Sequence, residues 1–126
     1  MRKNLFGTLA VSAALLAAGF VHAQEIKSIR IGSAAAKTGP GAGGAGVTHW
    51  PNVKLWVAQV NKEGGILLKS AGNKRVPVEL VEYDDRSSND DAVKAVERMA
   101  TQDKVDFIIA PWGTGAKLAT APVFAK

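Results

Sequence analysis

The sequence has 126 residues, no cysteine and only two histidines. A chain without cysteine forms no disulfide, no thiolate metal site and no thiol nucleophile. His22 lies in a segment that we expect to be removed, which leaves His49 as the single histidine of the mature chain. One histidine is too few for a zinc site and a poor basis for a Ser/His relay. We therefore predict no catalytic residue and no metal site.

A long run of one charge is also missing. The chain has 16 Lys and Arg residues against 11 Asp and Glu residues, which gives a formal net charge of +5. Two of the basic residues, Arg2 and Lys3, belong to the first segment, and the remaining charges are mixed in sign along the chain. Nucleic-acid binding needs a basic patch or stripe, so we predict no nucleic-acid partner.

The first 23 residues have the three zones of an export signal. Two basic residues supply a positive start, an apolar run follows from Leu9 to Phe20, and the segment ends at Ala23. The run is shorter than the ~20 residues that a membrane-spanning helix needs, so we predict cleavage after Ala23 and no direct membrane insertion. The mature chain, residues 24–126, is then expected in the periplasm. Nucleotide cofactors are scarce there, and we predict that the chain has no cofactor.

Apolar periodicity and turn residues divide the mature chain into alternating strands and helices. We predict strands at residues 26–33, 76–83 and 105–110, helices at residues 51–62, from Ser88 or Asn89 to about Thr101 and from near Thr114 onward, a long close-packed loop at residues 34–46, and an exposed turn at residues 66–75. Alternation of this kind predicts an α/β fold with a parallel sheet and helices on both faces. Three strands leave two open sheet edges, so we expect an incomplete lobe of a longer chain.

Two of these elements have apolar patterns that predict burial. One face of the 51–62 helix collects the residues at i, i+3, i+4 and i+7, which are Val53, Trp56, Val57 and Val60. Residues 105–110 are apolar at all but one position, which is typical of a central parallel strand covered on both faces.

A G-x-G-x-x-G pattern at Gly39, Gly41 and Gly44 supports a different function. This pattern binds the pyrophosphate of a dinucleotide where it directly follows a strand and opens a helix. Here the glycines begin well after the strand, and no clear helix signal opens at Gly44. Asp84 also lies about twice as far along as the ribose-binding acid, which is expected ~20 residues on. A Rossmann-type dinucleotide-binding enzyme fragment is therefore the alternative hypothesis.

Four acidic residues lie close together without the spacing of a calcium-binding loop: Asp84, Asp85, Asp90 and Asp91. We predict solvated turn and helix-cap roles for them. Asp90 and Asp91 suit the positive N-terminal end of the following helix, which Ser88 or Asn89 is placed to cap.

The loop after the third predicted strand is the candidate ligand site. Gly113 and Gly115 let backbone N–H groups approach a ligand, and Thr114 adds a hydroxyl at the positive start of the next helix. Such a loop is suited to hold a carboxylate or another small anion, and capping the helix is the other role open to Thr114. Trp112 is expected either to wall a cleft or to pack between lobes or against a helix.

Four segments together resemble a known family: I-R-I-G-S into T-G-P (29–40), V-A-Q-V-N-K-E-G-G-I (57–66), V-E-Y-D-D (81–85) and D-K-V-D-F-I-I-A-P-W-G-T-G (103–115). Behind an export signal, they resemble the N-terminal part of periplasmic substrate-binding proteins of the branched-chain amino acid type, which serve ABC transporters. The resemblance implies two hinged α/β lobes, with residues 24–126 in the first half of lobe one. It also implies capture of an amino acid or similar small polar ligand, delivery to a membrane permease, and no enzyme activity.

The resemblance implies that Thr114 and Gly115 bind the ligand's carboxylate, with Trp112 nearby. Many family members also place an aromatic residue from the loop after the first strand over the ligand. Residues 41–46 depart from this pattern, because they contain only glycine and alanine. The ligand is therefore open among a leucine-like amino acid, urea, a short amide and an aromatic acid. The ligand-binding lobe of a sensor or receptor is a further alternative.

Overall fold

The computed structural model describes residues 25–125, so the predicted export signal lies outside the described residues. The elements in chain order are β1 (Ile29–Ala34), α1 (Ala42–Thr48), α2 (Trp50–Lys62), β2 (Ile66–Leu68), a short 3-10 helix (Lys69–Ala71), β3 (Lys74–Val76), β4 (Val78–Tyr83), α3 (Asn89–Thr101), β5 (Phe107–Ile109) and α4 (Thr114–Phe124). Within residues 25–125, no helix combines the length and the apolar character that crossing a membrane requires.

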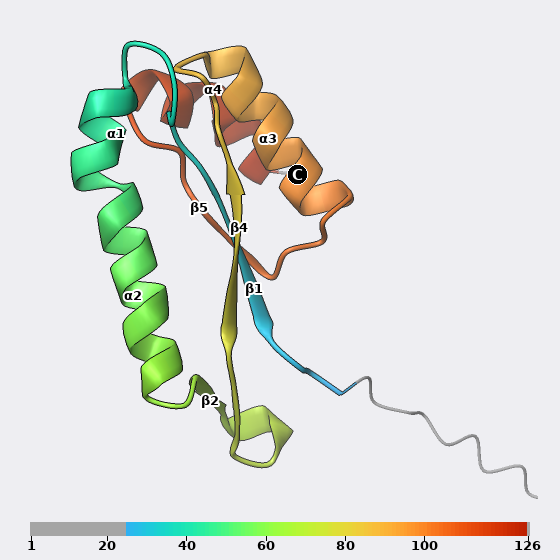
Figure 1. The fold of residues 1–126 in the computed structure, drawn as a ribbon. Coiled ribbons are helices and arrows are strands. Elements are labelled where there is room, and N and C mark those ends of the chain that lie inside the picture. Colours follow the sequence, from blue (N-terminus) through green and yellow to red (C-terminus); the bar gives the residue numbers. More distant parts are fainter. Residues whose placement is uncertain (1–24, 126) are drawn as a thin grey trace, which may run out of the picture.

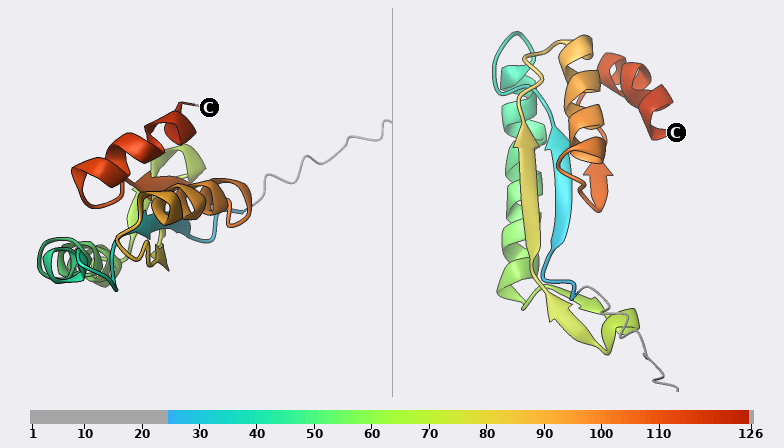
Figure 2. Two further views of the ribbon diagram at one scale, coloured as in Figure 1. Left: turned by 90° about the horizontal axis from the view of Figure 1, so that it is seen from above. Right: turned by 90° about the vertical axis from the view of Figure 1, so that its right-hand side faces the viewer.

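Three parallel strands form the main sheet, in the order β4-β1-β5. Ile31 of β1 lies opposite Leu80 of β4 on one side and Phe107 of β5 on the other. The helices α1 and α2 lie along one face of the sheet, and α3 covers the other face with α4 packed against it (Figures 1 and 2). The predicted α/β class, with a parallel sheet and helices on both faces, is confirmed.

Each face of the sheet has its own apolar core. The cluster on the α2 side contains Ile29, Ile31, Val76 and Val78, with Val57 and Val60 of α2 packed against it. The cluster on the α3 side contains Ala34, Ala95, Val96 and Met99. A Cβ atom on Gly32 of β1 would lie 2.3 Å from Sδ of Met99, so the glycine makes room for this side chain. Full burial of a methionine contributes roughly 1.5–3 kcal/mol.

Within residues 25–125 the strand β5 pairs only with β1, so it lies at an edge of the described sheet and β1 lies between β4 and β5. The sequence predicts part of a longer lobe, so the expectation that β5 is a central strand covered on both faces stays a prediction. Phe107 of β5 is 64% exposed, and Ala110 lies exposed beyond the end of the strand. An apolar run indicates that a strand tends to be buried, but it does not indicate which strands flank it. The order of the strands is set by pairing, which periodicity does not encode.

The predicted loop at residues 34–46 contains the helix α1, so this prediction is wrong. Each glycine costs about 1 kcal/mol in a helix relative to alanine, and the glycines of this segment conceal the helix from propensity arguments. Tertiary packing compensates for the poor propensity. Ala45 of α1 is fully buried and forms a cluster with Ala35, Ala36 and Trp50.

Residues 66–76 form a small antiparallel hairpin where the sequence predicted only a turn, and the predicted exposure of Lys69, Lys74 and Arg75 is confirmed. β2 pairs with β3, with Ile66 opposite Val76, and the guanidinium of Arg75 donates to the carbonyl oxygen of Gly65 at 2.7 Å. Strands of three residues are too short for an alternating pattern to be recognised. Pro77 separates β3 from β4, which divides the predicted 76–83 strand in two.

The predictions for α2 and α3 are confirmed in their main features. α2 ends at Lys62 as expected and begins at Trp50, one residue early. The hydroxyl of Ser88 caps α3 by accepting a hydrogen bond from the backbone N–H of Asp91. The exception is Trp56, which was expected on the buried face and is 42% exposed. Only the Val57 and Val60 positions of that stripe reach the core, so the buried face of α2 is narrower than the apolar one.

Candidate ligand-binding pocket

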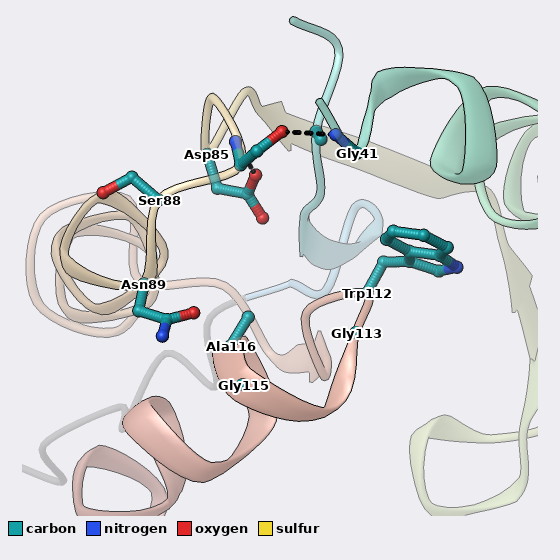
Figure 3. Close-up of a pocket in the computed structure, with 10 residues that line it drawn as sticks. Gly41, Asp85, Ser88, Asn89, Trp112, Gly113, Gly115 and Ala116 are labelled. Atoms are coloured by element: carbon teal, nitrogen blue, oxygen red, sulfur yellow. Dashed lines mark hydrogen bonds between the residues drawn. The ribbon is translucent and has the colours of Figure 1, made fainter. Parts of the chain in front are cut away.

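A pocket of about 160 Å³ opens where β1, β4 and β5 end, and we call it the carboxyl-edge pocket (Figure 3). Open α/β sheets bind ligands in the crevice outside the carboxyl ends of their strands, so the pocket lies where this fold favours binding. Three loops and the first turns of α3 and α4 supply the lining residues: Ala36, Gly41, Asp85, Ser87, Ser88, Asn89, Trp112, Gly113, Gly115 and Ala116.

The side chain of Asp84 joins two of these loops. Its carboxylate accepts hydrogen bonds from the backbone N–H of Lys37 at 2.8 Å, the hydroxyl of Thr38 at 2.7 Å and the backbone N–H of Arg86 at 2.8 Å. Burial opposes ionisation of Asp84, but these donors outweigh it and lower the pKa of the carboxyl to about 2. The loop after β1 is therefore tied to the end of β4 by one ionised carboxylate.

Close backbone contacts hold the same two loops together beside the pocket. The hydroxyl of Ser87 accepts a hydrogen bond from the backbone N–H of Gly41 at 2.9 Å and donates to the carbonyl oxygen of Thr38 at 3.0 Å. Gly39 has φ +82°, and a Cβ atom there would lie 2.7 Å from the carbonyl oxygen of Arg86. Only glycine fits this position, because both its conformation and its spacing exclude a side chain.

The ring of Trp112 packs against α1 and also lines the pocket (Figure 3). Its indole N–H donates to the hydroxyl of Thr48 at 2.9 Å. A Cβ atom on Gly44 would lie 2.4 Å from the ring, and one on Gly41 would lie 3.4 Å from it. The sequence left two roles open for Trp112, a wall of the cleft and packing against a helix. The side chain has both roles. The indole covers the glycine-rich helix and presents an aromatic surface where residues 41–46 offer none.

The start of α4 forms another side of the pocket. Gly113, with φ +94°, is the residue before the helix, and no side chain of the described chain caps it. The first N–H groups of a helix have no carbonyl partner within it and carry a partial positive charge. Gly115 and Ala116 line the pocket. Thr114 is exposed as the first residue of α4, next to the lining residues, and its ligand contact stays a prediction.

Asp85 is a pocket residue that the sequence analysis missed. It is 3% exposed, which corrects the expectation of a solvated role. Its Oδ1 atom accepts a hydrogen bond from the backbone N–H of Ser87 at 2.9 Å. Burial raises the pKa of Asp85, the Ser87 donor opposes the increase, and the charges of Asp84 and Asp91 add to it. No motif distinguishes this aspartate from Asp84, Asp90 and Asp91, which are less buried, because the pocket around it is formed by three separate loops.

His49 lies buried at the junction of α1 and α2. Its Nε2 atom and the hydroxyl oxygen of Ser33 in β1 are 2.8 Å apart, and its ring meets the ring of Trp50 edge-on at 5.1 Å. Burial lowers the pKa of His49 below 6.5, the Asp85 carboxylate opposes this shift, and Lys117 adds to it. Ser33 is fully buried, so the pair holds α1 on the sheet and offers no exposed nucleophile.

Comparison with known proteins identifies the family. A family model described as periplasmic binding protein matches residues 28–126. This match covers well over half of the chain, so the chain belongs to the periplasmic binding protein family. The resemblance that the four sequence segments indicated is confirmed. No curated protein sequence matches the chain.

Several solved structures share the fold. The substrate-binding protein LivJ of the branched-chain amino acid transporter from Streptococcus pneumoniae, in complex with isoleucine, is 27% identical with a TM-score of 0.66. A periplasmic binding protein type 1 from Bordetella pertussis Tohama I is 30% identical with a TM-score of 0.62. A solute-binding protein of an ABC transporter from Rhodopseudomonas palustris BisB5, in complex with 3,4-dihydroxybenzoic acid, is 26% identical with a TM-score of 0.59.

The similarity covers most of this chain but a small part of those structures. It spans 76%, 78% and 76% of this chain for the three proteins in the order given. It spans 25%, 24% and 24% of their own chains. The chain therefore corresponds to about a quarter of the length of each of these proteins.

Proposed function

We propose that this chain belongs to the solute-binding component of an ABC importer, which captures an amino acid or a similar small polar ligand in the periplasm. The observation that carries the proposal is the carboxyl-edge pocket, where an aromatic wall faces the uncapped start of a helix. Membership of the periplasmic binding protein family supports it, as does the similarity to a transporter protein solved with isoleucine. The role is binding and delivery to a membrane permease, without catalysis.

The pocket recognises the ligand by complementary charge and shape. The N–H groups at the start of α4, together with the hydroxyl of Thr114, receive the carboxylate or carbonyl oxygen of the ligand. Trp112 contacts the apolar part, because its ring is fixed by the hydrogen bond to Thr48 and by contact with Gly44. A hydrogen bond to a charged group contributes roughly 1.5–3 kcal/mol, so one hydroxyl accounts for a measurable share of the affinity.

The described geometry favours this function over dinucleotide binding. The glycines of the G-x-G-x-x-G pattern already have partners within the chain. The backbone N–H of Gly41 donates to Ser87, Gly39 contacts the backbone of Arg86, and Gly44 lies under the ring of Trp112. These contacts occupy the surfaces that a pyrophosphate needs on such a loop.

Calorimetric titration of the full-length protein with amino acids and small amides tests the proposal. Thr114→Val removes the hydroxyl while keeping the shape, and we expect it to weaken binding about ten- to a hundred-fold. Thr114→Ser keeps the hydroxyl and serves as the control, with affinity close to that of the wild type. Unchanged affinity in a folded Thr114→Val protein would contradict the role of Thr114. Absence of binding to every compound of the panel would contradict the proposed function.

A further inference from the structure

The side chain of Asp85 is largely buried, and only one of its two carboxylate oxygens has a donor within the described chain. The Oδ1 atom accepts the N–H of Ser87, while no residue between 25 and 125 donates to Oδ2. Figure 3 shows the carboxylate directed into the pocket, between Gly41 and the side of Asn89 and Ala116. Among the described residues no buried side-chain oxygen or nitrogen lacks a hydrogen-bond partner, so Oδ2 is accessible from the pocket that Asp85 lines. A donor group that enters the pocket can therefore reach this oxygen.

We propose that Asp85 is a specificity-determining residue of the pocket, and that its Oδ2 atom accepts a hydrogen bond from an ammonium or amide N–H group of the ligand. This inference rests on the proposed function and defines the class of ligand that the pocket takes. It gives the loop after β4 the role of accepting the hydrogen bond that the ligand donates. The other contacts of β4 and α3, the elements on either side of this loop, are structural.

The pocket has two poles of opposite character. The start of α4 offers N–H donors, whereas the side formed by the loop after β4 carries the carboxylate of Asp85. The neighbouring carboxylates of Asp84 and Asp91 make that side more negative, and burial together with these charges raises the pKa of Asp85. A ligand with an acceptor at one end and a donor at the other satisfies both poles. Amino acids and short amides have this pattern, and a simple carboxylic acid does not.

An aromatic wall adds an apolar surface to the two polar sides of the pocket. Trp112 closes one side with an aromatic surface, so the donor and the acceptor of a small ligand are held at the two poles while its apolar part meets the ring. A carboxylate without a donor would place its negative charge in the same small space as the carboxylate of Asp85.

The substitution Asp85→Asn tests the inference with little change in shape. The N–H of Ser87 needs an acceptor at the Oδ1 position, so the amide oxygen of asparagine stays there. The new NH2 group then occupies the place of Oδ2. The variant thus presents a donor where the wild type presents an acceptor. Asp90→Asn is the matched control, because Asp90 is an exposed aspartate of the same loop and helix start that does not line the pocket. It makes the same change in net charge.

The experiment uses pairs of compounds that differ in the donor: L-leucine with 4-methylpentanoate, and benzamide with benzoate. Calorimetric titration of the full-length wild type is expected to favour the donor-bearing member of a bound pair by about ten- to a hundred-fold. The Asp85→Asn variant is expected to lose this preference or reverse it, and Asp90→Asn to keep it. Circular dichroism melts establish that each variant is folded.

Three results would overturn the inference. The wild type binds the donor-free member as tightly as its partner, or a folded Asp85→Asn variant keeps the wild-type preference, or both aspartate variants change the preference equally. The wild-type comparison needs no variant and decides the matter even where Asp85→Asn fails to fold. Binding of donor-free acids alone would remove the role of Asp85 and leave the proposed solute-binding function intact, whereas absence of binding to all four compounds and to the wider panel would contradict that function as well.

Discussion

Two helices beside the pocket, α1 and α3, are held in place in opposite ways. α3 has a capping serine, acidic residues in its first turn and a buried stripe of Ala92, Ala95, Val96 and Met99. α1 has no side-chain cap and no acidic residue in its first turn, and three of its seven residues are glycine. It is held by contacts with Trp112 and by the buried cluster around Ala45. Local sequence thus determines α3, whereas distant parts of the chain determine α1.

This difference decides what the sequence predicts. Ser88 and the apolar stripe identify α3 correctly, since the cap and the 3.6-residue period lie within the element. Residues 41–46 do not identify α1, because the ring that packs on Gly44 comes from a loop after β5. The order of the described strands is likewise not predicted by local sequence, since it depends on pairing between distant segments.

The candidate site follows the same division. Gly115 and Trp112 were predicted from a loop whose position at the end of a strand is a local feature, and both line the pocket. Asp85 was not predicted to be buried, because its surroundings come from three loops that meet only in the fold. The double role of Trp112 also needed the structure, since the sequence shows a tryptophan but not the bare helix surface beneath it.

The largest expected effect is a loss of stability when the packing of α1 is disturbed. In Gly44→Ala, the new Cβ atom would lie 2.4 Å from the ring of Trp112. The ring must move away, and we expect a loss of roughly 1–3 kcal/mol in the free energy of unfolding of the full-length protein. Denaturant unfolding followed by circular dichroism measures it.

Gly43→Ala is the control for this substitution, because a Cβ atom there has no neighbour within 4 Å. Alanine is the better helix former, so we expect Gly43→Ala to stabilise the protein by up to about 1 kcal/mol. Equal effects of the two substitutions would show that Trp112 does not depend on Gly44, and the account of α1 would then be wrong.

A smaller effect is expected on the α3 side. Ser88→Ala removes the hydroxyl that accepts the N–H of Asp91, and the loss of a helix cap costs typically about 1 kcal/mol. Ser88→Asp restores a cap and serves as the control. Thermal melts of the full-length protein measure both variants. A melting temperature that is the same in Ser88→Ala and the wild type would show that α3 does not rely on its cap.

The smallest expected effect is the pH dependence of stability at His49, which lies at the end of α1. Burial lowers the pKa of His49 below 6.5, so the neutral form is favoured in the folded protein. Its contribution to stability is therefore present above pH 6.5 and is lost as the pH falls below that value. Asp84, with a pKa of about 2 against 3.8, loses its contribution only at lower pH, between these two values.

Denaturant unfolding at pH 7.5 and at pH 5 measures the contribution of His49. The variant His49→Gln has no titrating group at this position, and we expect the decrease in its stability between the two pH values to be smaller than in the wild type. An identical decrease in both proteins would assign the pH dependence to other groups and remove His49 from the explanation.

The central claim is that the carboxyl-edge pocket binds the ligand, and amide chemical shifts of the isotope-labelled full-length protein test it most directly. On titration with L-leucine, or with whichever compound of the screened panel binds most tightly, we expect shifts of the N–H signals of Gly115 and Ala116 and of the indole N–H of Trp112. The signal of Gly72 in the β2–β3 hairpin, far from the pocket lining, is expected to stay in place. Binding that leaves the three pocket signals unchanged would contradict the account.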